Sequence, residues 1–98
     1  MQRRNELALI ILAYNATVLF SMALVYQLIG FRRHFHVPEN TPVNFGTVLY
    51  FSLVTHFTVG YGDIYPTTQL SRSMVAVHIT LVWLQAAGIL FSWHKIKS

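Results

Sequence analysis

Hydrophobic residues along this chain fall into three runs separated by polar links. Residues 7–31 and residues 73–93 hold no charged side chain, and each run is long enough for a helix to cross a hydrocarbon core of about 30 Å. Residues 44–57 form a shorter apolar run, of a length typical of a buried or re-entrant helix. The pattern predicts an all-α membrane protein with two transmembrane helices and a short helix between them.

Polar residues indicate where these helices begin and end. Residues 32–42 include two prolines and predict a loop outside the bilayer. Asn44 is a suitable N-cap for the short helix, and Thr67 or Thr68 can cap the helix that follows. We expect the polar residues inside the first run to turn toward neighbouring helices; they are Asn15, Thr17, Ser21 and Gln27.

A secretory signal peptide is the alternative for the first run, because Arg3 and Arg4 precede it. The run is longer than the usual signal-peptide core of about 7 to 15 residues, and it lacks a clear small-residue cleavage site. Residues 1–6 are a polar lead too short for a separate helix along the membrane surface. The transmembrane interpretation is therefore preferred.

Composition agrees with a membrane location. Charged residues make up 10% of the chain and hydrophobic residues 54%, whereas soluble domains average about 25% charged. The basic residues lie beside the hydrophobic runs, as membrane-edge anchors do, and not in a stripe among aromatics that would bind nucleic acid. The terminal side carries Arg3, Arg4, Lys95 and Lys97, and the loop side carries Arg32, Arg33 and Arg72. This small excess leads us to expect both termini in the cytoplasm.

One stretch is explained better by chemistry than by packing: Thr58-Val59-Gly60-Tyr61-Gly62-Asp63. A row of backbone carbonyls aimed at one axis needs alternate residues in left-handed backbone conformation. Glycine adopts that conformation without a Cβ clash. Gly60 and Gly62 are spaced for this arrangement.

All six residues of this stretch resemble the selectivity filter of the potassium channels. The resemblance implies that residues 1–98 form a single pore domain, with an outer helix over 7–31, a pore helix over 44–57, a filter over 58–63 and an inner helix over 73–93. It implies a homotetramer in a lipid bilayer, with K⁺ bound at Thr58, Val59, Gly60 and Tyr61 and the filter continuing through Gly62. K⁺ is the permeant ion, and no cofactor, small-molecule substrate or covalent chemistry is expected.

Filter support is assigned to Tyr50, Phe51, Thr55 and Asp63, with Tyr50 and Phe51 expected to pack against Tyr61. Val54 stands where many relatives have a glutamate bonded to the aspartate, so we expect Asp63 to lack that partner and face water. Phe57 stands where a small hydroxyl residue is common, and it can either narrow the cavity or turn aside. The inner helix has no glycine near its middle, and Gly88 lies closer to its end.

The wider sequence resembles one branch, the miniature two-helix potassium channels of large algal viruses. Thr55-His56 before the filter, Ala76-Val77-His78-Ile79 in the inner helix and the short chain carry this resemblance. It implies a multi-pass protein of a host-cell or virion membrane. His34, His36, His56 and His78 are candidates for pH or metal sensing, against a plainer role in packing.

The leading hypothesis is therefore a potassium-selective channel that conducts passively and is not an enzyme. A non-selective cation channel of the same fold is one alternative. A small membrane adaptor that conducts nothing is the other.

Overall fold

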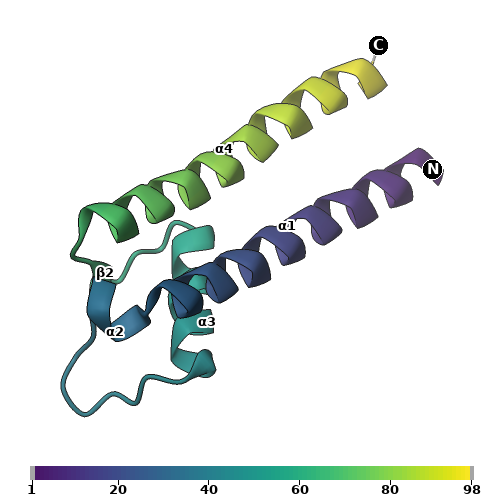
Figure 1. The fold of residues 1–98 in the computed structure, drawn as a ribbon. Helices are drawn as coiled ribbons and strands as arrows, with labels where there is room; N and C mark the ends of the chain where they lie inside the picture. The colour runs from purple at the N-terminus through teal and green to yellow at the C-terminus, as the bar shows by residue number, and fades with distance from the viewer. Residues whose placement is uncertain (1, 98) are drawn as a thin grey trace.

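A computed structural model describes residues 2–97 of the chain and, among these, the side chains of residues 4–91. Two long antiparallel helices dominate it, α1 (Gln2–Ile29) and α4 (Gln69–Lys97), and they place both ends of the chain at the same end of an elongated molecule (Figure 1). Segments Arg4–Ile29 and Gln69–Phe91 are long and apolar enough to cross a membrane. The expected membrane anchors Arg3, Lys95 and Lys97 have side chains outside the described residues.

Both long helices begin earlier than the hydrophobic pattern predicts. The polar residues from Gln2 onward continue into α1, which ends at Ile29 because Gly30 takes a φ of +96°. α4 begins at Gln69, where Thr68 Oγ1 accepts a hydrogen bond from the Ser71 amide at 3.2 Å and Ser71 Oγ accepts one from the Thr68 amide at 3.1 Å. Thr68 is thus the cap, one of the two candidates named from the sequence.

The link after α1 is more ordered than the loop that its polar residues predict. It contains one helical turn, α2 (Phe31–His34), and a two-residue strand, β1 (Phe35–His36). β1 pairs antiparallel with β2 (Tyr65–Pro66), with Phe35 opposite Pro66 and His36 opposite Tyr65. This pairing joins the segment after α1 to the segment before α4.

Aromatic packing explains why this link folds. The buried rings of Phe31 and Phe35 stack at 4.6 Å, and each meets the ring of Phe51 edge-on. Tyr26 on α1 meets Phe35 and Phe51 edge-on at 5.4 Å. Such offset and edge contacts suit aromatic quadrupoles. The prediction placed Phe31 at the end of the outer helix and Phe35 in a loop, and it missed that both belong to the core.

The short helix α3 (Phe45–His56) packs against α1 and α4 near one end of the molecule (Figure 1). Asn44 is its N-cap, as predicted, with Oδ1 accepting a hydrogen bond from the Thr47 amide at 3.0 Å. The other end of α3 is fixed beside Asn15, about halfway along α1, by a hydrogen bond from His56. α3 therefore starts at the loop end of the molecule and stops at mid-depth, which is the geometry of a re-entrant helix.

The N-cap gives the first testable prediction. Asn44→Ala should lower the free energy of unfolding by about 1 kcal/mol, because the Thr47 amide loses its acceptor. Asn44→Ser, which keeps an acceptor oxygen, should retain most of the stability. Thermal unfolding in detergent, followed by circular dichroism, measures both variants, and equal losses would contradict the capping role.

Candidate functional site

The segment after α3 is held to the last turn of that helix by backbone hydrogen bonds. The amide of Val59 donates to Val54 O at 2.9 Å, and the amide of Gly60 donates to the same oxygen at 3.3 Å. The Thr58 amide donates to Thr55 O at 3.0 Å. The segment thus satisfies carbonyls at the C-terminal end of α3 that the helix itself leaves unpaired.

The backbone of this segment alternates in handedness. Gly60 and Gly62 have φ angles of +55° and +85°, which confirms the conformation predicted for them. Thr58 has a φ of +57°, which the sequence did not predict. A left-handed conformation costs a residue with a Cβ about 1–2 kcal/mol, so the surrounding hydrogen bonds must maintain it at Thr58.

This alternation leaves the segment's own carbonyls unused. Among the described residues, no hydrogen bond reaches the carbonyl oxygens of residues 58–62. The Thr58 hydroxyl donates to Phe57 O at 2.7 Å, which leaves lone pairs on its oxygen available. Consecutive residues therefore offer several carbonyl oxygens that accept no hydrogen bond from the described residues. Such a row of oxygens suits a cation with little hydration.

Conformation, and not crowding, accounts for the glycines. A Cβ added at Gly60 or Gly62 would meet no atom of the chain within 4 Å. The side chains of Val59 and Tyr61 are 51% and 70% exposed in the single chain. Apolar side chains left this open, beside a backbone with unpaired carbonyls, indicate a surface that another molecule covers.

Asp63 has a partner, contrary to the expectation from the sequence. The Tyr50 hydroxyl donates to Asp63 Oδ2 at 3.0 Å, and the Ile64 amide donates to Oδ1 at 3.0 Å. Asp63 is nevertheless exposed, as expected. The hydrogen bond to Asp63 is the main cause that raises the pKa of Tyr50, followed by desolvation and the charge of the carboxylate. Tyr50 can thus supply the hydrogen bond to Asp63 that many relatives make with a glutamate at the position of Val54.

The other predicted support residues divide between two roles. Phe51 is buried in the aromatic core, and within the described chain its ring contacts are to Tyr26, Phe31 and Phe35 instead of Tyr61. Thr55 is buried and its carbonyl binds the Thr58 amide. Among the described residues, neither Tyr50 nor Phe51 makes the predicted ring contact with Tyr61.

Phe57 lies outside the core. Its side chain is 61% exposed and lines a crevice with Asn15, His56, Thr58, Trp83 and Gln85. The crevice lies on the side of the segment toward the ends of α1 and α4. Phe57 was expected either to narrow the cavity or to turn aside. Its exposed position leaves its ring available to the space beside the Thr58 end of residues 58–62.

The histidines occupy different surroundings. His34 Nδ1 lies 2.8 Å from Thr68 Oγ1 and helps to join α2 to the start of α4. His36 is exposed and stacks on Tyr65 at 4.7 Å. His56 and His78 are buried, and His56 Nδ1 lies 3.1 Å from His78 Nε2. His78 also bonds to Tyr26, and His56 to Asn15. The sequence did not predict that Asn15, Tyr26, His56 and His78 contact one another, although each is a polar residue in an apolar run.

Comparison with known protein families identifies the chain as an ion channel. The model of an ion channel family matches residues 7–93, a range that covers most of both long helices, all of α3 and residues 58–63. No curated protein and no solved structure matches the chain.

The Tyr50–Asp63 bond gives a second prediction. Asp63→Asn should lower the pKa of Tyr50 toward the usual tyrosine value, because the charged acceptor that favours the protonated phenol is removed. Alkaline titration of ¹³C-tyrosine-labelled protein in micelles, followed at Cζ, measures the change. Glu39→Gln, which removes an acid elsewhere in the loop, is the matched control; an equal shift in both variants would contradict the bond.

Proposed function

We propose that this chain, which belongs to the ion channel family, is the subunit of a potassium-selective channel. Its family membership and its two apolar helices make it a membrane protein that conducts ions passively. The proposal concerns the ion and the site: residues 58–62 form the filter, with K⁺ bound by the carbonyls of Thr58, Val59, Gly60 and Tyr61. K⁺ is the transported ion, and no catalytic step is involved.

The observation that carries this proposal is the alternating backbone of residues 58–62. Positive φ angles at Thr58, Gly60 and Gly62 leave consecutive carbonyls without a hydrogen bond from the described residues. A K⁺ ion in the low-dielectric membrane needs closely spaced oxygens to replace its hydration shell. Unpaired carbonyls are costly in that setting unless a cation binds them, so the ion and the backbone satisfy each other.

A single chain supplies only one column of oxygens, so several chains must surround the ion. We propose the homotetramer that the filter motif implies. It is supported by the exposed apolar side chains of Val59 and Tyr61, which need a neighbour. Residues 1–98 would then act as one pore domain, four copies of which enclose a single axis.

α3 adds an electrostatic contribution. Its C-terminal end stops at mid-depth, beside residues 58–62. A helix C-terminus carries about half a negative charge. Four such ends directed at a common axis would lower the energy of a cation at the depth where the bilayer penalises it most.

Two further assignments belong to the proposal. Both termini face the cytoplasm, since they lie at one end of the molecule and the basic residues near them slightly outnumber those at the loop end. The protein belongs to the miniature viral branch, in a host-cell or virion membrane. The two histidines that carry this resemblance, His56 and His78, contact each other.

Electrical recording separates the proposal from its alternatives. Purified protein in planar bilayers should give unitary currents that reverse near the K⁺ equilibrium potential in opposed K⁺ and Na⁺ gradients. Reversal near zero would favour the non-selective channel. Absence of currents from a preparation that native mass spectrometry identifies as a tetramer would favour the non-conducting adaptor and overturn the proposal.

A glycine substitution gives a third prediction. Gly60→Ser should abolish K⁺ selectivity or conduction, because a Cβ at a φ of +55° costs about 1–2 kcal/mol in each subunit. Gly88→Ser is the matched control, since Gly88 has ordinary helical geometry and open space around it. Permeability ratios from reversal potentials measure both, and equal selectivity in the two variants would contradict a carbonyl filter.

A further inference from the structure

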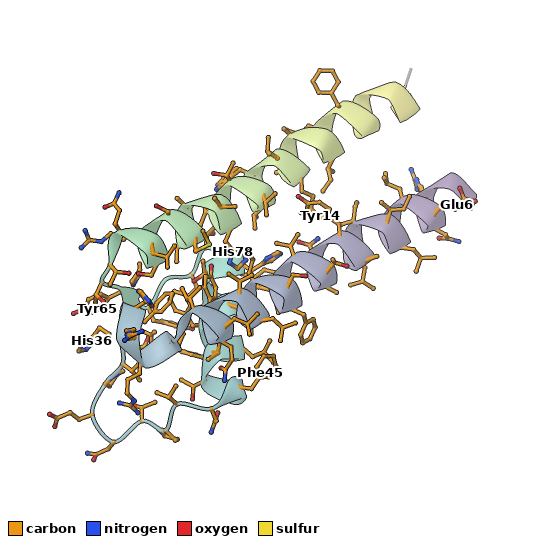
Figure 2. The ribbon with its side chains drawn as sticks, in the orientation of Figure 1. Glu6, Tyr14, His36, Phe45, Tyr65 and His78 are labelled. Carbon is orange, nitrogen blue, oxygen red and sulfur yellow. The ribbon has the colours of Figure 1, made fainter. Side chains whose placement is uncertain are left out.

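Two histidines from different helices meet beside the base of the filter segment. His56, the last residue of α3, has Nδ1 3.1 Å from Nε2 of His78 on α4. Its Nε2 lies 2.7 Å from Oδ1 of Asn15 on α1. Both histidines are buried, and Figure 2 places His78 between α4 and α1. One side chain of α3 is therefore bonded to both transmembrane helices.

The hydrogen bonds of this group have a single consistent direction. Asn15 Nδ2 lies 2.8 Å from Ile11 O, which can only accept, so Asn15 Oδ1 must face His56 and accept from Nε2–H. With His56 neutral, its Nδ1 accepts from His78 Nε2–H. His78 Nδ1 then accepts from the Tyr26 hydroxyl at 2.8 Å.

The group is also complete. Asn15 Nδ2 donates to Gln85 Oε1 on α4 at 2.6 Å, which closes the group on its other side. Among the described residues, no buried side-chain nitrogen or oxygen lacks a hydrogen-bond partner. Each member would leave at least one partner unsatisfied if it were replaced by an apolar residue, and such a loss costs about 1–3 kcal/mol.

The last turn of α3 transmits this anchoring to the filter. Val54 lies two residues before His56, and its carbonyl accepts hydrogen bonds from the amides of Val59 and Gly60; Thr55 lies one residue before, and its carbonyl accepts from the amide of Thr58. The side chain of His56 thus fixes the same turn whose carbonyls hold the strained φ angle of Thr58. A displacement of α4 at His78 would reach Thr58 through only two side chains and one helical turn.

We propose that His56 is a positioning residue for ion selection, which holds the base of the filter in register with the inner helix through His78 and with the outer helix through Asn15. The inference rests on the proposed potassium channel. His56 touches no ion; it acts by fixing the end of α3. Small displacements of the filter base change the spacing of the carbonyls, and selectivity depends on that spacing and on the field of the carbonyl dipoles.

Substitutions at His56 can separate hydrogen bonding from packing. His56→Gln keeps one donor and one acceptor at about the spacing of the two imidazole nitrogens, so it can bond to both Asn15 and His78. His56→Leu has similar bulk and can do neither. His78→Leu removes the bond of His56 to the inner helix and keeps its bond to Asn15; it also removes the bond from the Tyr26 hydroxyl. Ser52→Ala is the matched control, because Ser52 Oγ donates a buried 2.7 Å bond from α3 to Leu19 O on α1 and has no bond to α4.

The experiment measures the K⁺ to Na⁺ permeability ratio of each variant in planar bilayers, together with the thermal stability of its tetramer. His56→Leu and His78→Leu should each lower the ratio by about tenfold, because each removes the buried His56–His78 hydrogen bond that links α3 to α4. The double leucine variant should lose less than the sum of the two single losses, because both single variants remove the shared His56–His78 bond. His56→Gln and Ser52→Ala should stay within about twofold of the unmodified protein, with Ser52→Ala reduced in stability only.

The outcomes are distinguishable. Unmodified protein that does not select K⁺ overturns the proposed function itself. If the unmodified protein selects K⁺, either leucine variant with an unchanged permeability ratio overturns the positioning role. So does a loss in Ser52→Ala equal to that in His56→Leu, since any buried bond of α3 would then suffice. Failure of both leucine variants to assemble, with His56→Gln intact, would assign the pair to assembly and overturn the role in selection.

Discussion

An irregular backbone at mid-membrane depth has no water to satisfy its polar groups, and this constraint shapes the whole chain. Non-helical segments are tolerated at such depth only where protein buries them or where they line a water- or ion-filled path. The amides of Val59 and Gly60 in the segment 58–62 donate hydrogen bonds to Val54 O. The carbonyl oxygens of residues 58–62 accept no hydrogen bond from the described residues. The short helix α3 thus provides the acceptor for these two amides. In the proposed channel, a cation and neighbouring chains would satisfy the carbonyls.

Holding α3 at that depth is a separate problem, because lipid offers no hydrophobic driving force between helices. The chain solves it differently at the two ends of α3. Toward the loop, the aromatic core of Tyr26, Phe31, Phe35 and Phe51 fills the space between α1, the link and α3. At mid-depth, hydrogen bonds from His56 replace packing. Tyr26 belongs to both groups, since its ring joins the aromatic core and its hydroxyl bonds to His78.

The outline of the fold and the backbone conformation of Gly60 and Gly62 could be predicted from the sequence, because they depend on local rules. The length of the hydrophobic runs predicted the two spans, and Asn44 predicted the start of α3. The spacing of Gly60 and Gly62 predicted their left-handed conformation. What could not be predicted depends on contacts distant in the chain. The Tyr50–Asp63 bond spans 13 residues and the His56–His78 contact 22. The burial of Phe31, at the end of the predicted outer helix, and of Phe35, in the predicted loop, depends on Phe51, which lies on another helix. The left-handed Thr58 runs against its own residue type and follows only from the bonds around it.

The polar group at mid-depth also determines how α4 is turned about its axis. His78 and Gln85 are seven residues apart, which places them two turns apart on one helix face, and Leu81 O on the same face accepts from the Tyr14 hydroxyl at 2.9 Å. Apolar packing alone tolerates rotation of a helix, because many neighbouring leucines and valines can substitute for one another. Directional bonds at three successive levels of one face do not, because a rotation that brought His78 away from Tyr26 would also separate Gln85 from Asn15. The face of α4 opposite to these bonds, which includes the 63% exposed Trp83, is therefore fixed in orientation by them.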